Sequence, residues 1–175
     1  RHPVIYKQER LTMNDRRFDI YKFRTMVPDA EVKSGPVLAT ENDERITKIG
    51  SVLRATRIDE LPQLFNVLKG DMSVVGPRPE RPHFAEIYKK KYGTYRYRLA
   101  VKAGLTGLAQ IAGKYETDVE DKLRYDLYYI RNYSVFFDIV IILKTLKVVL
   151  DKQKASGITL PKRVEDVRDQ KNIGM

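Results

Sequence analysis

The stretch VFFDIVIILKTLKVVL, from Val135 to Leu150, is the longest apolar segment of the chain and limits most strongly what the chain can form. A helix that spans a membrane needs roughly 20 predominantly apolar residues. This stretch is shorter, and Asp138, Lys144 and Lys147 interrupt it, so we expect it not to span. Because apolar residues lie on most of its circumference, the pattern predicts a helix that is either buried or laid on a membrane surface.

The composition is that of a basic chain large enough for one domain with its own core. The 175 residues are 42% hydrophobic, and 33 Lys and Arg against 23 Asp and Glu give a net charge of +10. Such a surface attracts phosphates, nucleic acids or anionic lipids, so the charge alone selects no partner. There is no cysteine, and His2 and His83 lie far apart. Disulfides, thiolate metal sites and a zinc site are therefore not expected.

Hydrophobic periodicity predicts a compact single domain of the α/β (α+β) class. Residues Val4–Gln8 and Phe18–Met26 have strand patterns on either side of a polar turn, which predicts a small N-terminal β-hairpin or sheet. Residues 103–113 are typical of a Gly-punctuated loop and strand. We expect a domain over residues 1–152 and a polar C-terminal tail over 153–175. Several short amphipathic helices are predicted from helical spacing in residues 46–56, 61–68, 84–92 and 119–132.

Two adjacent carboxylates, Asp59 and Glu60, precede the helical segment 61–68. Pro62 is tolerated only in a first helical turn, so we expect Asp59 at or beside the N-terminal cap. There the helix dipole favours the ionised carboxylate, which is then available as a nucleophile or as a ligand of a hard metal ion. Mg²⁺ shared with a diphosphate would suit the pair. The alternative is an ordinary helix start without chemistry.

Three basic side chains are expected near this acid pair. In FDIYKFRTM, a period of two places Lys22 and Arg24 on one face of a strand, although a solvated edge would show the same pattern. Arg78 stands between Pro77 and Pro79, which stiffen the backbone and prepare the guanidinium to grip a phosphate with two hydrogen bonds. The alternative for Arg78 is a proline-rich surface turn.

More charged residues surround the Gly-rich segment AGLTGLAQIAG. Arg98, Lys102 and Lys114 add positive charge there. Asp126 and Asp138 interrupt apolar stripes of two predicted helices. Because a buried, unpaired carboxylate is costly, we expect each of these acids to pair with one of the cations.

Several long motifs, in the order in which they occur, resemble those of the bacterial sugar transferases, or monotopic phosphoglycosyl transferases. The resemblance covers nearly all of the chain and implies transfer of sugar 1-phosphate from a UDP-sugar to undecaprenyl phosphate, with release of UMP, at the start of polysaccharide or glycan assembly. The motifs are PVIYKQERL, FDIYKFRTM, NDERITKIGSVLRATRIDELPQLFNVLKGDMSVVGPRPERP, VKAGLTGLAQIAGKY and KLRYDLYYIRNYSVFFDIVIILKTLKVVL.

The resemblance also implies roles for individual residues. In the family mechanism the Asp of the Asp-Glu pair forms a covalent phosphosugar intermediate, and that Asp matches Asp59. Glu60 matches the second acid, with an inferred role in Mg²⁺ binding or in activating the lipid phosphate. Lys22 and Arg24 match the basic pair of the family's KFRTM segment and Arg78 the Arg of its PRP turn, and we assign these three to phosphate binding and to neutralising charge in the transition state. Further phosphate-binding residues are expected among the cations near the Gly-rich segment, namely Arg98, Lys102 and Lys114.

A membrane location follows from the same resemblance. Family members usually carry a hydrophobic N-terminal segment before the motif that matches PVIYKQER, so we interpret this chain as a catalytic domain without that segment. The native location would be the cytoplasmic face of the bacterial inner membrane, with short helices on its anionic surface. A homo-oligomer is left open. The sequence departs from the family pattern at Ala103, where Pro is frequent, and at AGKY, which replaces an Asn-Gly-Arg-like stretch.

Two other classes of function compete with this interpretation. The net charge would permit a nucleic-acid-binding module. We expect no nucleic-acid partner, because the aromatic residues are mostly tyrosines in helical stripes and no known reader motif occurs. A membrane-surface module without catalysis would leave the acid pair idle.

Overall fold

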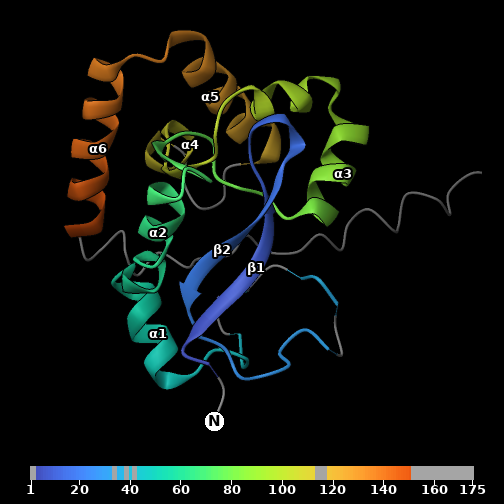
Figure 1. The fold of residues 1–175 in the computed structure, drawn as a ribbon, viewed down its shortest axis with the longest axis vertical. Coiled ribbons are helices and arrows are strands. Elements are labelled where there is room, and N and C mark those ends of the chain that lie inside the picture. The colour runs from blue at the N-terminus through green and yellow to red at the C-terminus, as the bar shows by residue number, and fades with distance from the viewer. Residues whose placement is uncertain (1–2, 33–34, 38–39, 41–42, 113–117, 151–175) are drawn as a thin grey trace, which may run out of the picture.

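The computed structural model describes residues 3–32, 35–37, 40, 43–112 and 118–150. Its first element is a long hairpin of strands β1 (Ile5–Leu11) and β2 (Arg17–Phe23), whose register runs from Ile5 opposite Phe23 to Leu11 opposite Arg17 (Figure 1). The predicted hairpin is therefore confirmed. Its strands end differently from the prediction, since β1 continues to Leu11 and β2 stops one residue before Arg24.

The predicted helices are confirmed, some with shifted ends, and the mixed fold class is confirmed with them. Thr47 caps the first helix through a bond from the Gly50 N–H to its hydroxyl (2.9 Å). Gly70 follows the second with a φ of 77°, a conformation that glycine adopts at little cost. The helices are α1 (Lys48–Ala55), α2 (Gln63–Leu68), α3 (Pro82–Lys91), α5 (Val119–Asn132) and α6 (Val135–Leu150).

The short elements β3 (Ser73–Val75) and α4 (Leu108–Ala112) were not predicted from the sequence, whereas β4 (Gly104–Thr106) lies in residues 103–113, where a loop and a strand were predicted. Strands β3 and β4 form a parallel pair, and α4 follows directly. Elements of three to five residues show no usable periodicity. The chain also forms three 3₁₀ helices in its described part: η1 (Met13–Asp15), η2 (Ile58–Glu60) and η3 (Gly93–Ala100).

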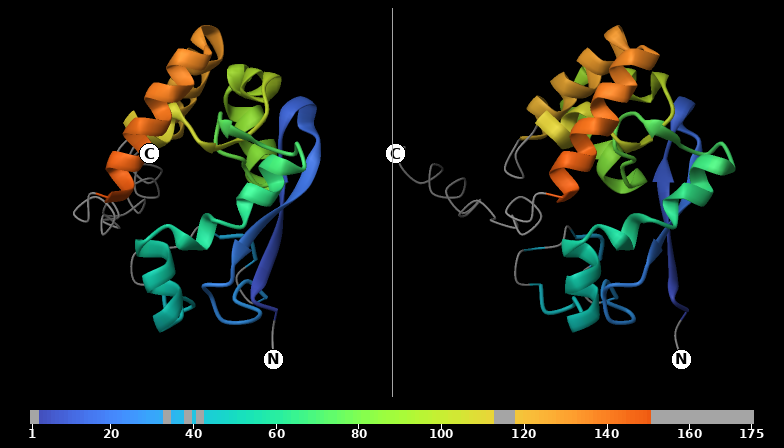
Figure 2. Two further views of the ribbon diagram at one scale, coloured as in Figure 1. Left: turned by 60° about the vertical axis from the view of Figure 1, so that its left-hand side comes forward. Right: turned by 90° about the vertical axis from the view of Figure 1, so that its left-hand side faces the viewer.

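Three apolar clusters join these elements. One connects the hairpin end with α3, η3 and α5, and a second packs β2 against Met72. The third joins β3, α5 and α6, and Ile141 at its centre has no exposed surface. Figure 2 shows α6 and α5 together at one end of the molecule and α1 at the other, with the hairpin running between them.

The helix α2 is unusual because its polar residues face inward. Gln63 and Asn66 are buried, whereas Leu64, Phe65 and Leu68 are 46%, 65% and 83% exposed. The Asn66 side chain donates to the Asp19 carbonyl (2.8 Å) and accepts from the Tyr21 N–H (3.0 Å), so it pairs with β2 as a neighbouring strand would. The polar contacts of Asn66 and the packing of Val67 on the cluster around Met72 therefore hold α2 to the domain, while its other apolar side chains point outward.

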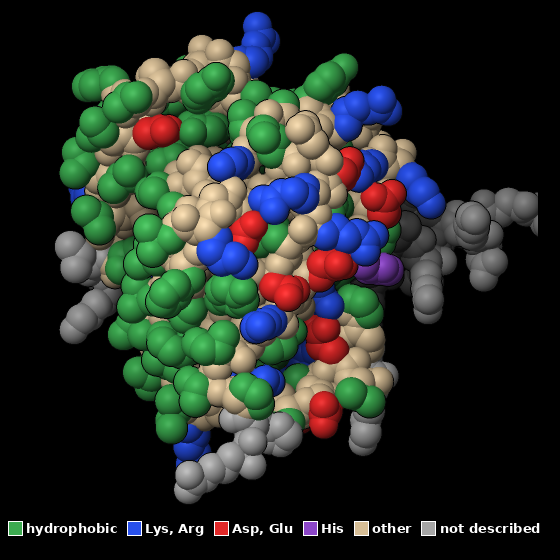
Figure 3. Space-filling view, viewed as in Figure 1, with side chains coloured by type: hydrophobic (Ala, Val, Ile, Leu, Met, Phe, Trp, Pro, Cys, Tyr) green, Lys and Arg blue, Asp and Glu red, His purple; other side chains and the backbone are tan. Residues whose placement is uncertain are grey.

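Many of the exposed apolar side chains gather on one side of the molecule. Figure 3 shows them over α1, α2 and α6, which share a side in Figure 1. Within the part of the chain that the structure describes, none of the helices is long and apolar enough to cross a membrane. Residues 153–175, the predicted tail, lie outside the described residues. The most exposed of these side chains are Ile49, Val52, Phe65, Leu68, Val135 and Phe136.

Candidate active site

The acid pair lies in the turn η2 between α1 and α2. Arg57, which precedes η2, has a left-handed backbone with φ of 59°, an uncommon conformation for a residue with a side chain. The turn after α1 leaves Asp59 directed inward, and this residue is 7% exposed. Left-handed residues other than glycine are frequent at functional sites, where the surrounding structure holds the strained turn.

The environment of Asp59 corrects the predicted one. The residue lies in η2, before Pro62, which caps α2, and not at the cap itself. Its Oδ1 atom is buried and has no hydrogen-bond partner among the described residues. Burial raises the pKa of the Asp59 carboxyl, and the charge of Glu60 raises it further, although the nearby cations oppose both. The direction of this shift is opposite to the one expected from a helix dipole acting on Asp59.

Glu60, the second acid, lies between two of the predicted cations. Its Oε1 accepts from Lys22 Nζ (3.0 Å) and from Arg78 Nη2 (2.8 Å). Burial alone would raise the pKa of Glu60, but the charges of Arg78 and Lys22 outweigh it and hold the pKa well below its usual range. Burial lowers the pKa of Lys22. The Arg78 side chain remains 44% exposed, so part of its guanidinium faces the open side of the site.

The remaining predicted cations lie elsewhere. Arg24 donates to the Pro3 carbonyl (2.9 Å) and packs over the Tyr6 ring. The Lys102 amine lies beside Gly70 at the end of α2. Neither makes an ion pair with the acid pair in the described part of the chain. Lys114 falls outside the described residues.

Arg98 points into the protein and not toward open solvent, in contrast to its predicted phosphate-binding role. Its Nε donates to Asp126 Oδ2 (2.5 Å), its Nη1 to the Tyr95 hydroxyl (3.0 Å), and its Nη2 to the Arg78 carbonyl (2.6 Å). Asp126 is thus paired with a cation as predicted. Burial would lower the pKa of Arg98, but the charge of Asp126 raises it. Arg98 consequently holds the backbone of Arg78.

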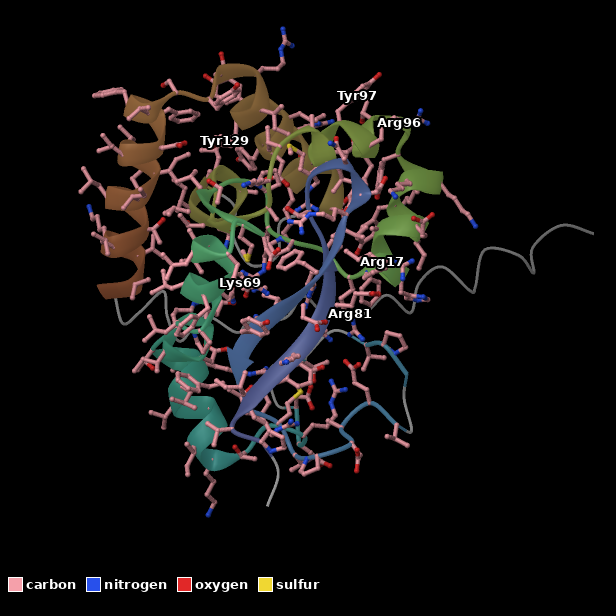
Figure 4. The ribbon with its side chains drawn as sticks, viewed as in Figure 1. Arg17, Lys69, Arg81, Arg96, Tyr97 and Tyr129 are labelled. Atoms are coloured by element: carbon pink, nitrogen blue, oxygen red, sulfur yellow. The ribbon has the colours of Figure 1, made fainter. Side chains whose placement is uncertain are left out.

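Within the described residues Asp138 makes no ion pair with a cation, in contrast to the prediction for this residue. It accepts from the hydroxyl of Tyr129 (2.8 Å), a buried side chain of α5 labelled in Figure 4. The bond joins α6 to α5, so Asp138 has a structural partner and lies apart from the acid pair.

Residues 77–80, which we call the arginine turn, are held by hydrogen bonds to four consecutive carbonyls. One of the donors is Arg10, a partly buried residue of β1. It was not among the predicted site residues, although it lies in the motif PVIYKQERL. Burial lowers the pKa of Arg10 to about 10, so it stays charged at neutral pH. The donors are the Gly104 N–H to Pro77 (2.9 Å), Arg98 Nη2 to Arg78 (2.6 Å), Arg10 Nη1 to Pro79 (3.3 Å) and the Leu11 N–H to Glu80 (2.9 Å).

The residues present can contribute to a divalent-cation site only together with a substrate. No group of three or more His, Cys, Asp or Glu side chains suited to a metal ion occurs in the described residues. The unpartnered Asp59 Oδ1 is one available oxygen, whereas Glu60 Oε1 is already bound to two cations. This set fits Mg²⁺, which is commonly held by one or two carboxylates plus substrate oxygens and water.

A buried carboxylate with an oxygen unpartnered among the described residues lies next to an ion-paired acid and a partly exposed arginine, an arrangement that has the charges suited to a phosphate substrate. Comparison with known proteins identifies the family. The sequence model described as Bacterial sugar transferase matches residues 1–152, and the chain belongs to this family. The resemblance in the sequence motifs is thereby confirmed.

Curated relatives with specific names are similar over most of the chain. The UDP-N-acetylgalactosamine-undecaprenyl-phosphate N-acetylgalactosaminephosphotransferase of Aeromonas hydrophila is 44% identical over 151 residues, which cover 85% of this chain and 36% of the relative. The UDP-glucose:undecaprenyl-phosphate glucose-1-phosphate transferase of Klebsiella pneumoniae is 46% identical, covering 82% and 32%. The galactosyl transferase CpsE of Streptococcus agalactiae serotype III is 47% identical, covering 85% and 35%. The chain thus spans about a third of the length of these relatives.

Proposed function

We propose that this chain carries the catalytic site of a phosphoglycosyl transferase, which moves sugar 1-phosphate from a UDP-sugar to undecaprenyl phosphate and releases UMP. The names of the relatives support the general reaction. The observation that carries the proposal is the Asp59 carboxylate, buried with a free oxygen beside the network of Glu60, Lys22 and Arg78. Such a carboxylate is poorly solvated and therefore suited to act as a nucleophile.

The proposed reaction has two displacements at one phosphorus atom. First, an ionised oxygen of Asp59 attacks the phosphorus that bears the sugar, and the bond from this phosphorus to the bridging oxygen breaks, so that UMP leaves with the electron pair. Second, an oxygen of undecaprenyl phosphate attacks the same phosphorus, and the bond to Asp59 breaks and restores the carboxylate. Each step replaces one phosphorus–oxygen bond by another, so no oxidant or reductant is needed.

The surrounding residues would stabilise the charge that develops during these steps. Arg78 presents a fixed and partly exposed guanidinium, which suits the oxygens of the transferred phosphoryl group. Lys22 is buried against Glu60 and adds positive charge on the inner side of the site. Glu60 keeps both cations in place, in addition to its proposed part in binding Mg²⁺ or in activating the lipid phosphate. Mg²⁺, when held by Asp59, Glu60 and substrate oxygens, would supply further charge neutralisation.

The exposed apolar side chains support a location on a membrane surface, which the lipid substrate also requires. Ile58 and Leu61 flank the acid pair and are 41% and 54% exposed. The apolar face of α2 continues directly from them. We propose that this side of the domain rests on the anionic cytoplasmic surface of the bacterial inner membrane, where Lys144 and Lys147 of α6 add electrostatic attraction. The nucleophile would then lie close to the level of the lipid phosphate.

The test is UMP release by the purified chain with undecaprenyl phosphate in detergent micelles, Mg²⁺ and a panel of UDP-sugars. We expect release with one or more UDP-sugars, its loss on Asp59→Asn, and a covalent mass increase on Asp59 when the lipid is omitted. Asp121→Asn is the matched control, because Asp121 is an exposed acid on α5 paired with Arg124. If the Asp59→Asn variant released UMP as fast as the wild type, Asp59 could not be the nucleophile.

A further inference from the structure

The arginine turn is held by charged side-chain donors in addition to neutral backbone N–H groups. Two of its four carbonyls accept from guanidinium groups, those of Arg98 and Arg10. Their side chains are only 10% and 17% exposed. Burying a charged donor to bind a neutral carbonyl is unfavourable unless an acid compensates the charge. The two guanidinium groups thus add two charged hydrogen bonds that restrict the backbone of this turn.

Acids compensate both guanidinium groups, but to different extents. Arg98 meets Asp126, which is 2% exposed, at 2.5 Å, whereas Arg10 lies 3.5 Å from the partly exposed Glu80. Tyr95 occupies the Nη1 atom of Arg98 (3.0 Å). All three nitrogens of Arg98 are thus bound, and one of them binds the carbonyl of the residue that reaches Glu60. Arg98 is the more rigidly held of the two donors.

We infer that Arg98, fixed by Asp126 and Tyr95, is a positioning residue for Arg78 in the reaction. It sets the backbone of Arg78 so that Nη2 meets Glu60 at 2.8 Å while the 44% exposed side chain stays directed at the substrate phosphate. A preset guanidinium loses less freedom when it binds the transferred phosphoryl group. This inference deepens the proposed function and rests on it for its kinetic consequences.

The kinetic test is a double-mutant cycle between Arg98 and Arg78. Arg98→Lys keeps a positive charge opposite Asp126 but has one nitrogen in place of three. We expect kcat/KM for UMP release to fall about tenfold to a hundredfold, mainly through kcat, which is the size of a lost buried hydrogen bond to a charged group. In an Arg78→Ala background the same change should matter less than about twofold, because it acts through Arg78. Losses that multiply in the double variant would overturn the inference.

Two controls protect this cycle from effects on folding. Arg124→Lys makes the same exchange on the exposed face of α5, the helix that carries Asp126, and should leave kcat/KM unchanged. Tyr95→Phe removes only the Nη1 partner of Arg98 and serves if Arg98→Lys fails to fold. It should lower kcat/KM about twofold to fivefold, the size of one neutral hydrogen bond, and again only when Arg78 is present.

A spectroscopic measurement separates failure of this inference from failure of the proposed function. The Nε–H signal of Arg78 in ¹H–¹⁵N spectra can be assigned by its loss in Arg78→Lys. We expect this signal to shift or broaden in Arg98→Lys and to stay unchanged in Arg124→Lys. An unchanged signal in Arg98→Lys would refute the positioning role. A responsive signal in a chain that releases no UMP would keep the positioning role and reject the proposed reaction.

Discussion

Asp59 and Glu60 are sequence neighbours, yet neutralising each should change the stability of the fold in opposite directions. Folding raises the pKa of Asp59 above its ordinary value of 3.8, through burial first and the charge of Glu60 second. A group whose pKa rises on folding stabilises the fold fully below its unfolded pKa, and this contribution is lost as the pH rises through the folded pKa. Ionised Asp59 therefore costs stability at neutral pH, and Asp59→Asn should be more stable than the wild type.

Glu60 behaves in the reverse manner. Burial disfavours its charge, but Arg78 and Lys22 lower its pKa below the ordinary 4.5. Its contribution to stability is therefore present above pH 4.5 and is lost as the pH falls through the depressed folded pKa. Glu60→Gln leaves Lys22, whose side chain is 19% exposed, without its charge partner. The variant should be less stable than the wild type at neutral pH.

The magnitudes follow from burial and from the partners that each change removes. Breaking a buried ion pair costs about 3–5 kcal/mol. The amide introduced by Glu60→Gln would retain one acceptor oxygen, and Arg78 is partly exposed, so we expect a loss of about 2–3 kcal/mol for this variant. Removing the charge of an unpartnered buried carboxylate should gain about 1 kcal/mol for Asp59→Asn. In a chain of this size these values correspond to roughly 5–10 °C downward and 2–4 °C upward in Tm.

The assay is urea unfolding of the wild type and both variants at about pH 7 and about pH 3, with the free energy of unfolding compared at each pH. Both differences from the wild type should shrink toward the acidic pH, because the two carboxylates lose their charge in the unfolded chain. Two variants that change stability in the same direction at neutral pH would refute the electrostatic interpretation. The interpretation would also be refuted if Asp59→Asn raised the free energy of unfolding by the same amount at about pH 3 as at about pH 7.

Three further changes test the packing and the outward apolar face. Gly50→Ala should lower the free energy of unfolding by about 3 kcal/mol, because the added Cβ would overlap the Thr25 carbonyl oxygen. Gly93→Ala is the control: the space around Gly93 is open, so the free energy of unfolding in the same urea titration should be nearly unchanged. Asn66→Ala should cost about 2 kcal/mol, since it removes a fully buried side chain and leaves two partly buried backbone groups of β2 without their partner. A loss below about 1 kcal/mol would contradict this role. Phe65→Ser should weaken binding to anionic phospholipid vesicles about tenfold with little change in Tm, as judged by flotation. Tyr97→Ser is its control, because Tyr97 is similarly exposed but lies in η3, away from α2 (Figure 4).

Elements with a clear period were the ones that the sequence could predict. The helices α5 and α6 begin and end at the predicted residues, since each keeps its apolar repeat over several turns. The strands β3 and β4 depend on close backbone contact instead. A Cβ on Gly104 would overlap the Gly76 nitrogen, so the pairing requires glycine at this point. Such a long-range requirement has no local periodic signal.

The sequence predicted only part of the arrangement found at the candidate site. Glu60, Lys22 and Arg78 meet as expected from their joint presence in the motifs. Arg24 shares the predicted strand face with Lys22 but contacts the Pro3 carbonyl and the Tyr6 ring instead of the acid pair, and a period of two in the sequence does not show this difference. Arg98 was assigned to substrate because a charged residue near a Gly-rich loop looks the same in sequence whether it faces solvent or the core. Its direction depends on Asp126, which is 28 residues away.

The inverted polarity of α2 links the two proposed properties of the domain. A helix whose apolar residues all faced the core would be held by hydrophobic burial, but Leu64 and Phe65 point outward, so the polar contacts of Asn66 hold α2 in place together with the packing of Val67. The turn η2, which carries Asp59, directly precedes this helix. Contact of the apolar face with a membrane would therefore set the height of the nucleophile above the lipid phosphate, while the bonds of Asn66 to β2 keep Glu60 aligned with Lys22. Detachment from the membrane should then reduce access of the lipid substrate without disturbing the ion pair, which makes the membrane contact and the chemistry separable by mutation.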